Sequence, residues 1–327
     1  MDRRDCIRWA GAAFATQFLG SRASAQTKYP QGPIRVIVPY PPGGVVDAVA
    51  RPWAQGMKTA LGTVIIDNRS GGGGTIGAAA VARATTDGHT LLFGDTASQI
   101  ISPYLMINKP YDTVKDFAAV SMIAASSTSI VVHPSVPATT LEELIKYVKT
   151  SGQQLSYASA GIGTTSYLAG ELFKQLIGKP DILDVPYRGS GPALIDLIGG
   201  VVPMATPVIT GQVLGFHRAG KVRILAVCAP ARLKVAPDIP AAVETLPGLS
   251  VQDTIGVLAP AGTAQSIIDQ ISAANAKAMQ DPDFNRVLEA GGFEVRSDAS
   301  PNAAKAFLIA EREHLVPIIK AAGLEPY

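Results

Sequence analysis

The sequence has few of the residues on which enzymes most often depend. Its 327 residues include two cysteines and four histidines, and none of the histidines has a cysteine or carboxylate at the spacing of a metal site. The pattern G-x-S-x-G is absent, and Ser190, although glycines flank it, lacks the strand-to-elbow frame of a catalytic serine. Without a nucleophile–base pair or a ligand cluster, we expect no catalysis, no metal and no cofactor.

An excess of one charge is also missing. Charged residues make up 17% of the chain and hydrophobic residues 47%, which is the composition of a compact folded protein. Residues 1–25 hold four arginines and two aspartates, so the chain beyond them carries 24 basic and 24 acidic side chains. A net charge of zero gives no electrostatic reason to expect a nucleic acid or an anionic membrane surface as a partner.

Hydrophobic runs long enough to span a bilayer are absent, and the N-terminal run, Trp9–Leu19, is too short. It follows a positive region that includes Arg3 and Arg4, and it precedes Ala-Ser-Ala at 23–25. This order is typical of an export signal cleaved before Gln26, although a buried first helix is the alternative. The paired arginines fit the twin-arginine pattern only partly, so both export routes stay open. We expect a periplasmic protein.

Cysteine cannot cross-link the exported chain. Cys6 lies before the apolar run, so it is not a lipoprotein cysteine, and it is removed with the signal. Cys228 then remains alone, within the apolar run Ile224–Ala229. We expect it to be a buried, inert thiol that packs as a small apolar residue.

Strand-like and helix-like patterns alternate along the rest of the chain. Short apolar runs rich in β-branched residues predict strands at residues 34–38, 63–66, 90–93, 130–132, 155–157, 222–227 and 255–258. Amphipathic spacing predicts helices at residues 45–61, 76–84, 141–150, 165–177, 192–198, 264–279, 282–290 and 301–322. This order favours parallel sheets with helices on both faces.

Two segments suggest how the chain is divided. His133–Thr140 and Ala259–Thr263 each follow an apolar strand. If these strands cross between two lobes, the last third of the chain returns to the first lobe. Two lobes joined by two crossovers would then enclose a cleft.

The stretch Val38–Arg51, VPYPPGGVVDAVAR, combines a strand end, a glycine turn and a helix start. Gly43 and Gly44 permit backbone angles that other residues avoid, and they place no Cβ beside the turn. Asp47 lies in the first helical turn, where we expect it to accept turn N–H groups and hold the loop rigid. Free N–H groups at such a helix start suit an anion, although a tight turn with nothing bound has the same pattern.

Three further glycine-rich stretches follow strands. Asn68–Ala78 is not a phosphate loop, because no Gly-Lys-Ser/Thr follows, and its G-x-G-x-x-G match is weak within a run of four glycines. Tyr157–Phe173 places hydroxyls and N–H groups at a helix start, with ordinary capping by Thr164 as the alternative. Val185–Gly200 contributes Arg188, the one cation in these loops, which is also compatible with a solvated surface position. Such donor-rich loops without a catalytic pair suit binding without chemistry.

Nine segments in this order resemble the solute receptors of tripartite tricarboxylate transporters, the TctC-like, Bug-type proteins. They are PIRVIVPYPPGGVVDAVAR, NRSGGGGTIGA, DGHTLLFG, KPYDTVKDFAAVS, LSYASAGIGTTSYLAGELF, VPYRGSGPALIDLIGG, GKVRILAV, VLAPAGT and DPDF. The series runs over nearly the whole exported chain and is specific to the family.

The resemblance implies a two-lobed α/β fold, the type II periplasmic-binding-protein fold, in which each lobe is a mainly parallel sheet flanked by helices. Lobe 1 would comprise residues 26–128 and 250–327, and lobe 2 residues 129–249.

The same resemblance implies a ligand cleft between the lobes and a small organic carboxylate as ligand. One carboxylate is typically held by the loops matching Pro42–Asp47 and Ser159–Thr165, through backbone N–H groups and ordered water. The expected ligand-binding residues are Tyr40, Gly43, Gly44, Val45, Asp47, Asp95, Ser159, Gly163, Thr164, Thr165, Thr206 and Asp253.

Two departures from the family pattern fall at positions that would face the cleft. Residues 205–207, Ala-Thr-Pro, stand where the family often has an FDN-like triplet. Asp253 and Thr254 stand where a tryptophan often precedes a GLLAP-like strand. We therefore expect the carboxylate clamp to be kept and the specificity end to be changed.

These expectations describe a monomeric receptor that delivers a small organic acid to the permease subunits of a tripartite transporter. An extracytoplasmic sensing subunit for a membrane histidine kinase needs the same cleft and is the alternative. An exported hydrolase would require a serine, a histidine and an acid to converge. Gene neighbourhood separates the first two, and activity on a panel of esters tests the third.

Overall fold

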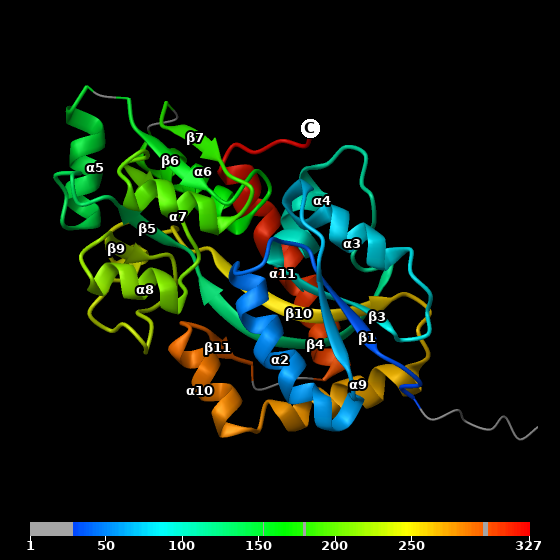
Figure 1. The fold of residues 1–327 in the computed structure, drawn as a ribbon. Coiled ribbons are helices and arrows are strands. Elements are labelled where there is room, and N and C mark those ends of the chain that lie inside the picture. Colours follow the sequence, from blue (N-terminus) through cyan, green and yellow to red (C-terminus); the bar gives the residue numbers. More distant parts are fainter. Residues whose placement is uncertain (1–28, 153, 179–180, 297–299) are drawn as a thin grey trace, which may run out of the picture. The chain divides into compact units, whose positions relative to one another are not determined.

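A computed structural model describes residues 29–327 apart from positions 153, 179, 180 and 297–299. The elements named below belong to one unit, Gly32–Tyr327. They form two β-sheets with helices packed around them (Figure 1). The expected signal peptide lies outside the described residues. Within those residues, no helix has both the length and the apolar character that a membrane crossing requires.

The first sheet joins strands from the two ends of the chain in the order β11-β4-β10-β3-β1-β2. β1 pairs in parallel with β2 and β3, whereas β10 runs antiparallel to β3 and β4, and β11 runs antiparallel to β4. The strand bounds are β1 Ile34–Val38, β2 Val64–Asn68, β3 Thr90–Asp95, β4 Phe117–Ser127, β10 Gln252–Pro260 and β11 Glu294–Val295.

The second sheet is built from the middle of the chain, in the order β7-β6-β8-β5-β9. β6 pairs in parallel with β7 and β8, whereas β5 runs antiparallel to β8 and β9. The strand bounds are β5 Ser129–Val132, β6 Ser156–Ser159, β7 Leu183–Pro186, β8 Met204–Ala205 and β9 Arg223–Val227.

The chain passes between the sheets at two neighbouring points. β4 continues through Thr128 into β5, and Val251 leads back into β10. The backbone N–H and the hydroxyl of Thr128 both donate to the carbonyl of Val251, at 3.1 and 2.9 Å. Since one strand leaves the first sheet and the other returns to it, β4 and β10 run in opposite directions. The α/β class is therefore confirmed, but the expectation of mainly parallel sheets is wrong, and both sheets are mixed.

The helices cover both sheets. α2 packs on β1, β2 and β3 and against α9, and it buries Trp53, whose Nε1 donates to Asn275 Oδ1 at 2.7 Å. The helix bounds are α2 Val45–Leu61, α3 Thr75–Ala82, α4 Ser102–Leu105, α5 Leu141–Thr150, α6 Thr165–Ile177, α7 Ser190–Ile198, α8 Gly211–Arg218, α9 Gln265–Ala278, α10 Pro282–Ala290 and α11 Pro301–Ala321. Short helical segments lie at Gly72–Gly74 (η1), Ala97–Ile101 (η2, a π-helical turn) and Ala242–Glu244 (η3).

The C-terminal helix reaches from one sheet to the core beside the other. α11 packs along β4 of the first sheet. Its residues Leu315 and Ile319 belong to the same buried cluster as Leu168 and Phe173 of α6. Cys228, directly after β9, lies in this cluster and is fully buried, as the sequence predicted.

Candidate functional site

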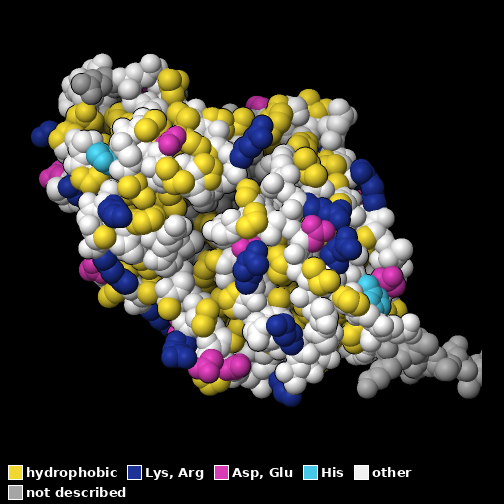
Figure 2. All heavy atoms as spheres, viewed as in Figure 1, with side chains coloured by type: hydrophobic (Ala, Val, Ile, Leu, Met, Phe, Trp, Pro, Cys, Tyr) yellow, Lys and Arg dark blue, Asp and Glu magenta, His cyan; other side chains and the backbone are white. Residues whose placement is uncertain are grey.

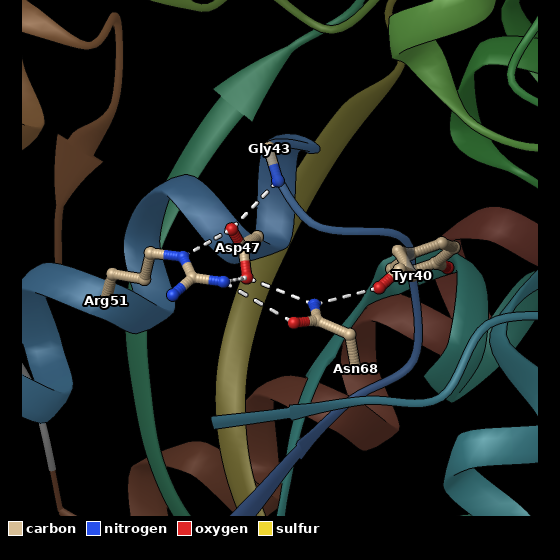
Figure 3. A network of polar contacts seen from close by, with 5 residues as sticks. All are labelled: Tyr40, Gly43, Asp47, Arg51 and Asn68. Atoms are coloured by element: carbon tan, nitrogen blue, oxygen red, sulfur yellow. Dashed lines mark hydrogen bonds and ion pairs between the residues drawn. The ribbon is translucent and has the colours of Figure 1, made fainter. Parts of the chain in front are cut away.

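One buried carboxylate holds the loop between β1 and α2. Asp47 Oδ2 accepts a hydrogen bond from the Gly43 N–H at 2.9 Å and from Arg51 Nε at 2.6 Å (Figure 3). Its Oδ1 accepts from Asn68 Nδ2 at 3.0 Å. Burial acts to raise the pKa of Asp47, but the hydrogen bonds from Arg51, Gly43 and Asn68 outweigh it and leave the pKa below its ordinary value. Asp47 therefore stays ionised and braces the turn, as the sequence predicted.

The two glycines of this loop have different roles. Asn68 Nδ2 also donates to the Tyr40 carbonyl at 3.0 Å, so the loop is tied to β2 (Figure 3). Gly43 has φ of 77°, in the left-handed region that glycine favours. Gly44 has φ of −77° and ψ of 178°, which any residue can adopt. The expectation of special backbone angles is therefore correct for Gly43 and wrong for Gly44, whose backbone lines a cavity instead.

Three helices begin at that cavity. α2 follows Gly44 and α7 follows Gly189, and neither helix has a side-chain cap. α6 follows Thr164, whose Oγ1 accepts from the Tyr167 N–H at 3.2 Å, so the expected capping is observed. The first N–H groups of an α-helix have no intrahelical acceptor and carry partial positive charge. Their convergence makes this cavity favourable for an anion.

The walls of the cavity come from both sheets. The space between its walls that no atom fills is about 570 Å³, which includes open solvent at the mouth of the cavity. The lining residues are Tyr40, Pro41, Pro42, Gly44, Val45, Val46, Asp95, Ala160, Thr164, Thr165, Ser166, Arg188, Gly189, Ser190, Gly191, Pro192, Val208 and Asp253. Arg188 is the one basic side chain among them. Over the face of the protein seen in Figure 2, acidic and basic side chains are interspersed and form no large patch of one charge.

Two buried carboxylates line the same cavity. Asp95 Oδ1 accepts from Tyr40 Oη at 2.8 Å, and from Ser98 Oγ and the Ser98 N–H at 2.6 and 2.9 Å. Ile255 of β10 pairs with Asp95 of β3. Since cross-strand partners share a face of the sheet, as do residues two apart on a strand, Asp253 lies on the same face as Asp95.

The two carboxylates disfavour each other's charge. Burial raises the pKa of Asp253 well above its ordinary value, and the negative charge of Asp95 raises it further. Burial also raises the pKa of Asp95, against hydrogen bonds from Ser98 and Tyr40 that lower it. In the described part of the chain, no three histidine, cysteine or carboxylate side chains gather in a way that could hold a metal ion.

The structure brings seven of the twelve expected site residues to the cavity wall. They are Tyr40, Gly44, Val45, Asp95, Thr164, Thr165 and Asp253. The other five, Gly43, Asp47, Ser159, Gly163 and Thr206, are not among the lining residues, although each belongs to a segment beside the cavity.

These five residues make contacts that support the loops. The Gly163 carbonyl accepts from Ser102 Oγ at 2.9 Å. Thr206 Oγ1 donates to the Ser166 carbonyl at 2.7 Å, and Ser159 Oγ accepts from the Gly161 N–H at 3.3 Å. The Ser159 hydroxyl shapes its own turn, and the Thr206 hydroxyl ties the end of β8 to the first turn of α6, so a supporting role accounts for both residues without direct contact to a ligand.

The sequence marked Val185–Gly200 as a donor-rich loop but placed none of its residues among the expected ligand-binding residues. Arg188, Gly189 and Ser190 belong to the cavity wall, and Arg188 is solvent-exposed. The available signal was the repeated pattern of strand, glycine turn and helix in Val185–Gly200, the same pattern that marked the β1–α2 loop. Ser166 and Val208 had no such signal, because their exposure to the cavity depends on tertiary packing.

Comparisons with known proteins agree with this architecture. The family model described as tripartite tricarboxylate transporter family receptor matches residues 49–324. A protein encoded in the tcbD–tcbE intergenic region of Pseudomonas sp. strain P51 is 36% identical over 301 residues, which cover 91% of this chain and 89% of that protein.

Two solved structures have bound carboxylates in their descriptions. Rpa4515 of R. palustris with adipate is 30% identical, with a TM-score of 0.87, and the match covers 92% of this chain and 100% of that one. MatC of Rhodopseudomonas palustris with bound malate is 31% identical, with a TM-score of 0.83 and coverage of 89% and 100%. The extent of the family match and the agreement in fold show that the chain belongs to the tripartite tricarboxylate transporter receptor family.

Proposed function

We propose that this protein is a periplasmic receptor that captures a small organic carboxylate and delivers it to the permease subunits of a tripartite tricarboxylate transporter. The observation that carries the proposal is the convergence of the N-termini of α2, α6 and α7 on one cavity. Backbone N–H groups there have no competing side-chain cap at α2 and α7. They can therefore donate charge-assisted hydrogen bonds to a ligand carboxylate, which are stronger than neutral ones.

The family membership supports a solute-binding role, and the adipate and malate complexes of the two similar proteins support a carboxylate. We propose that the exported monomer begins near Gln26. Lobe 1 then consists of residues 26–128 and 250–327 and lobe 2 of residues 129–249, with closure around the ligand. Contacts made only in the closed state would shift the population towards it.

A thermal-shift screen of small organic acids tests the proposal. A ligand present at about 100 times its Kd adds roughly 2.7 kcal/mol to the free energy of unfolding, which gives a measurable rise in Tm. We expect at least one mono- or dicarboxylate to raise Tm, and calorimetric titration then gives its Kd. If no carboxylate of such a panel binds at millimolar concentration, the proposed function is wrong.

A further inference from the structure

Asp253 places a carboxylate in the wall of the cavity, and the binding of an anion gives this side chain no role. Its side chain lines the cavity and is 2% exposed. Its Oδ1 accepts no hydrogen bond from any residue that the structure describes. Buried polar atoms in proteins nearly always have a hydrogen-bond partner. A carboxylate oxygen without one, in the wall of a ligand cavity, points to a donor that the ligand supplies.

Asp95 makes the surroundings of Asp253 more negative. Asp95 is 5% exposed, and its position is fixed by hydrogen bonds from Tyr40 and Ser98. In the described part of the chain, neither Asp95 nor Asp253 forms an ion pair. Burial and the charge of Asp95 raise the pKa of Asp253 and so favour its neutral form before a ligand binds. A positive group on the ligand would favour the ionised form of Asp253 and would be attracted to both carboxylates, whereas a second ligand carboxylate placed here would be repelled by Asp95.

The backbone around Asp253 is held by its neighbours in the sheet. Asp253 lies opposite Ser126 of β4, and β10 pairs with β3 as well from Ile255 onward. The N–H of the next residue, Thr254, donates to Thr96 Oγ1 at 2.8 Å. A side chain carried by a doubly paired strand needs little further ordering when a ligand binds, which favours its use as a recognition group.

We propose that the ligand carries a protonated amine in addition to its carboxylate, and that Asp253 accepts hydrogen bonds from this ammonium group. The inference rests on the proposed function, because it assigns the carboxylate end of the ligand to the helix N-termini. The chemical class is a small zwitterionic amino acid. Asp253 is then the residue that selects amino acids over dicarboxylates of the same length.

Ligands matched in everything but one end group test this selection on the unmodified protein. The four-carbon set is 4-aminobutanoate, 4-hydroxybutanoate and succinate, which share one carboxylate and differ in an ammonium, a hydroxyl or a second carboxylate. The three-carbon set is 3-aminopropanoate, 3-hydroxypropanoate and malonate, and alanine with lactate covers a 2-amino acid. In at least one set, calorimetric titration should give a Kd at least tenfold lower for the amino member than for either other member.

Asp253→Asn supplies the second arm, because it removes the charge with little change in shape. We expect it to raise the Kd of the preferred amino acid at least tenfold, to leave the Kd of the hydroxy member within about twofold, and to improve binding of the dicarboxylate. Asp269→Asn is the matched control, since Asp269 is exposed on α9, away from the cavity lining, and its loss changes the net charge equally. The control should leave all Kd values unchanged.

The outcomes separate this inference from the proposed function. Tighter binding of dicarboxylates or hydroxy acids than of amino acids in every set overturns the inference and leaves the receptor role standing. An equal loss for all three members in Asp253→Asn also overturns it, because the residue then acts on the fold of the cavity. If no member binds and no other carboxylate does, the proposed function fails as well. The ligand comparison needs no variant, so it decides the question even where Asp253→Asn does not fold.

Discussion

Replacing Gly44 by valine should abolish ligand binding while leaving the fold nearly intact. The backbone at Gly44 has angles that valine can adopt. A Cβ added there would lie 3.3 Å from the Pro41 carbonyl oxygen, a tight contact that a small shift relieves. The remainder of the valine side chain would occupy the cavity beside the N-terminus of α2. Losing even two charge-assisted hydrogen bonds, at about 1.5–3 kcal/mol each, costs at least about 3 kcal/mol, or more than a hundredfold in Kd.

The neighbouring glycine provides the matched control for this prediction. Gly43 has a positive φ, so Gly43→Ala should lower the free energy of unfolding by about 1–2 kcal/mol. Its added Cβ would meet no atom within 4 Å, and Gly43 does not line the cavity, so binding should change little. Calorimetric titration gives the affinities, and thermal unfolding gives the stabilities. If Gly44→Val binds like the parent protein, the ligand carboxylate does not lie at this loop and the site is misassigned.

Three further predictions concern the brace, the thiol and the closure of the cavity. Asp47→Asn should lower stability by about 1 kcal/mol at neutral pH, since Arg51 is largely exposed. The pKa of Asp47 is lower in the folded state than in the unfolded state, so its ionised side chain stabilises the fold at pH values above the ordinary pKa. This stabilisation is lost as the pH falls through the pKa of the folded state. The free energies of unfolding of the variant and the parent protein should therefore converge in acid. Burial raises the pKa of the Cys228 thiol to about 12, so a thiol reagent should label it only in denaturant, and rapid labelling of native protein would contradict its burial. Ligand should reduce the radius of gyration in small-angle scattering, and Thr164→Val should weaken both binding and this compaction, whereas an unchanged radius at saturation would indicate a rigid receptor.

Local patterns predicted most of the helices and seven of the eleven strands that the structure describes. The bounds of α2, α5, α6 and α10 agree with the sequence expectation, because each helix has a clear amphipathic period and an identifiable start. β1 was equally clear, since four of its five residues are isoleucine or valine. Polar caps, proline and β-branched runs are local signals, so they can be found without knowledge of the tertiary structure.

The long strand β4 and the short helix α8 were not predicted. β4, FAAVSMIAASS, consists mostly of alanine and serine, which have little intrinsic preference for strands. It forms because β10 and β11 pair with it on both sides, a tertiary effect that no local pattern records. The mixed direction of the first sheet follows from β10, which returns from the second sheet and runs antiparallel to both β3 and β4. Parallel sheets were expected because no local pattern records the direction in which a distant strand returns.

In the candidate site, too, local patterns predicted some features and the tertiary structure was needed for the others. The sequence identified the loops at α2 and α6 because glycine, hydroxyl and helix signals coincide there. Asp95 and Asp253 were expected at the cleft, but only the pairing of β3 with β10 shows that the two acids share a face. That neither acid has an ion-pair partner among the described residues is a property of the packing and could not be derived from the sequence.

The proposed use of main-chain donors at the helix starts has a consequence for how such a receptor evolves. A substitution in these loops that preserves the path of the backbone and places no side-chain atoms in the cavity preserves the donors as well, so positions that point away from the cavity tolerate drift in side-chain identity. The other end of the cavity is defined by side chains such as that of Asp253, and a single codon change there alters the chemistry offered to a ligand. Gene duplicates of one ancestor could therefore diverge in the nutrient they recognise through few substitutions, without rebuilding the anchor.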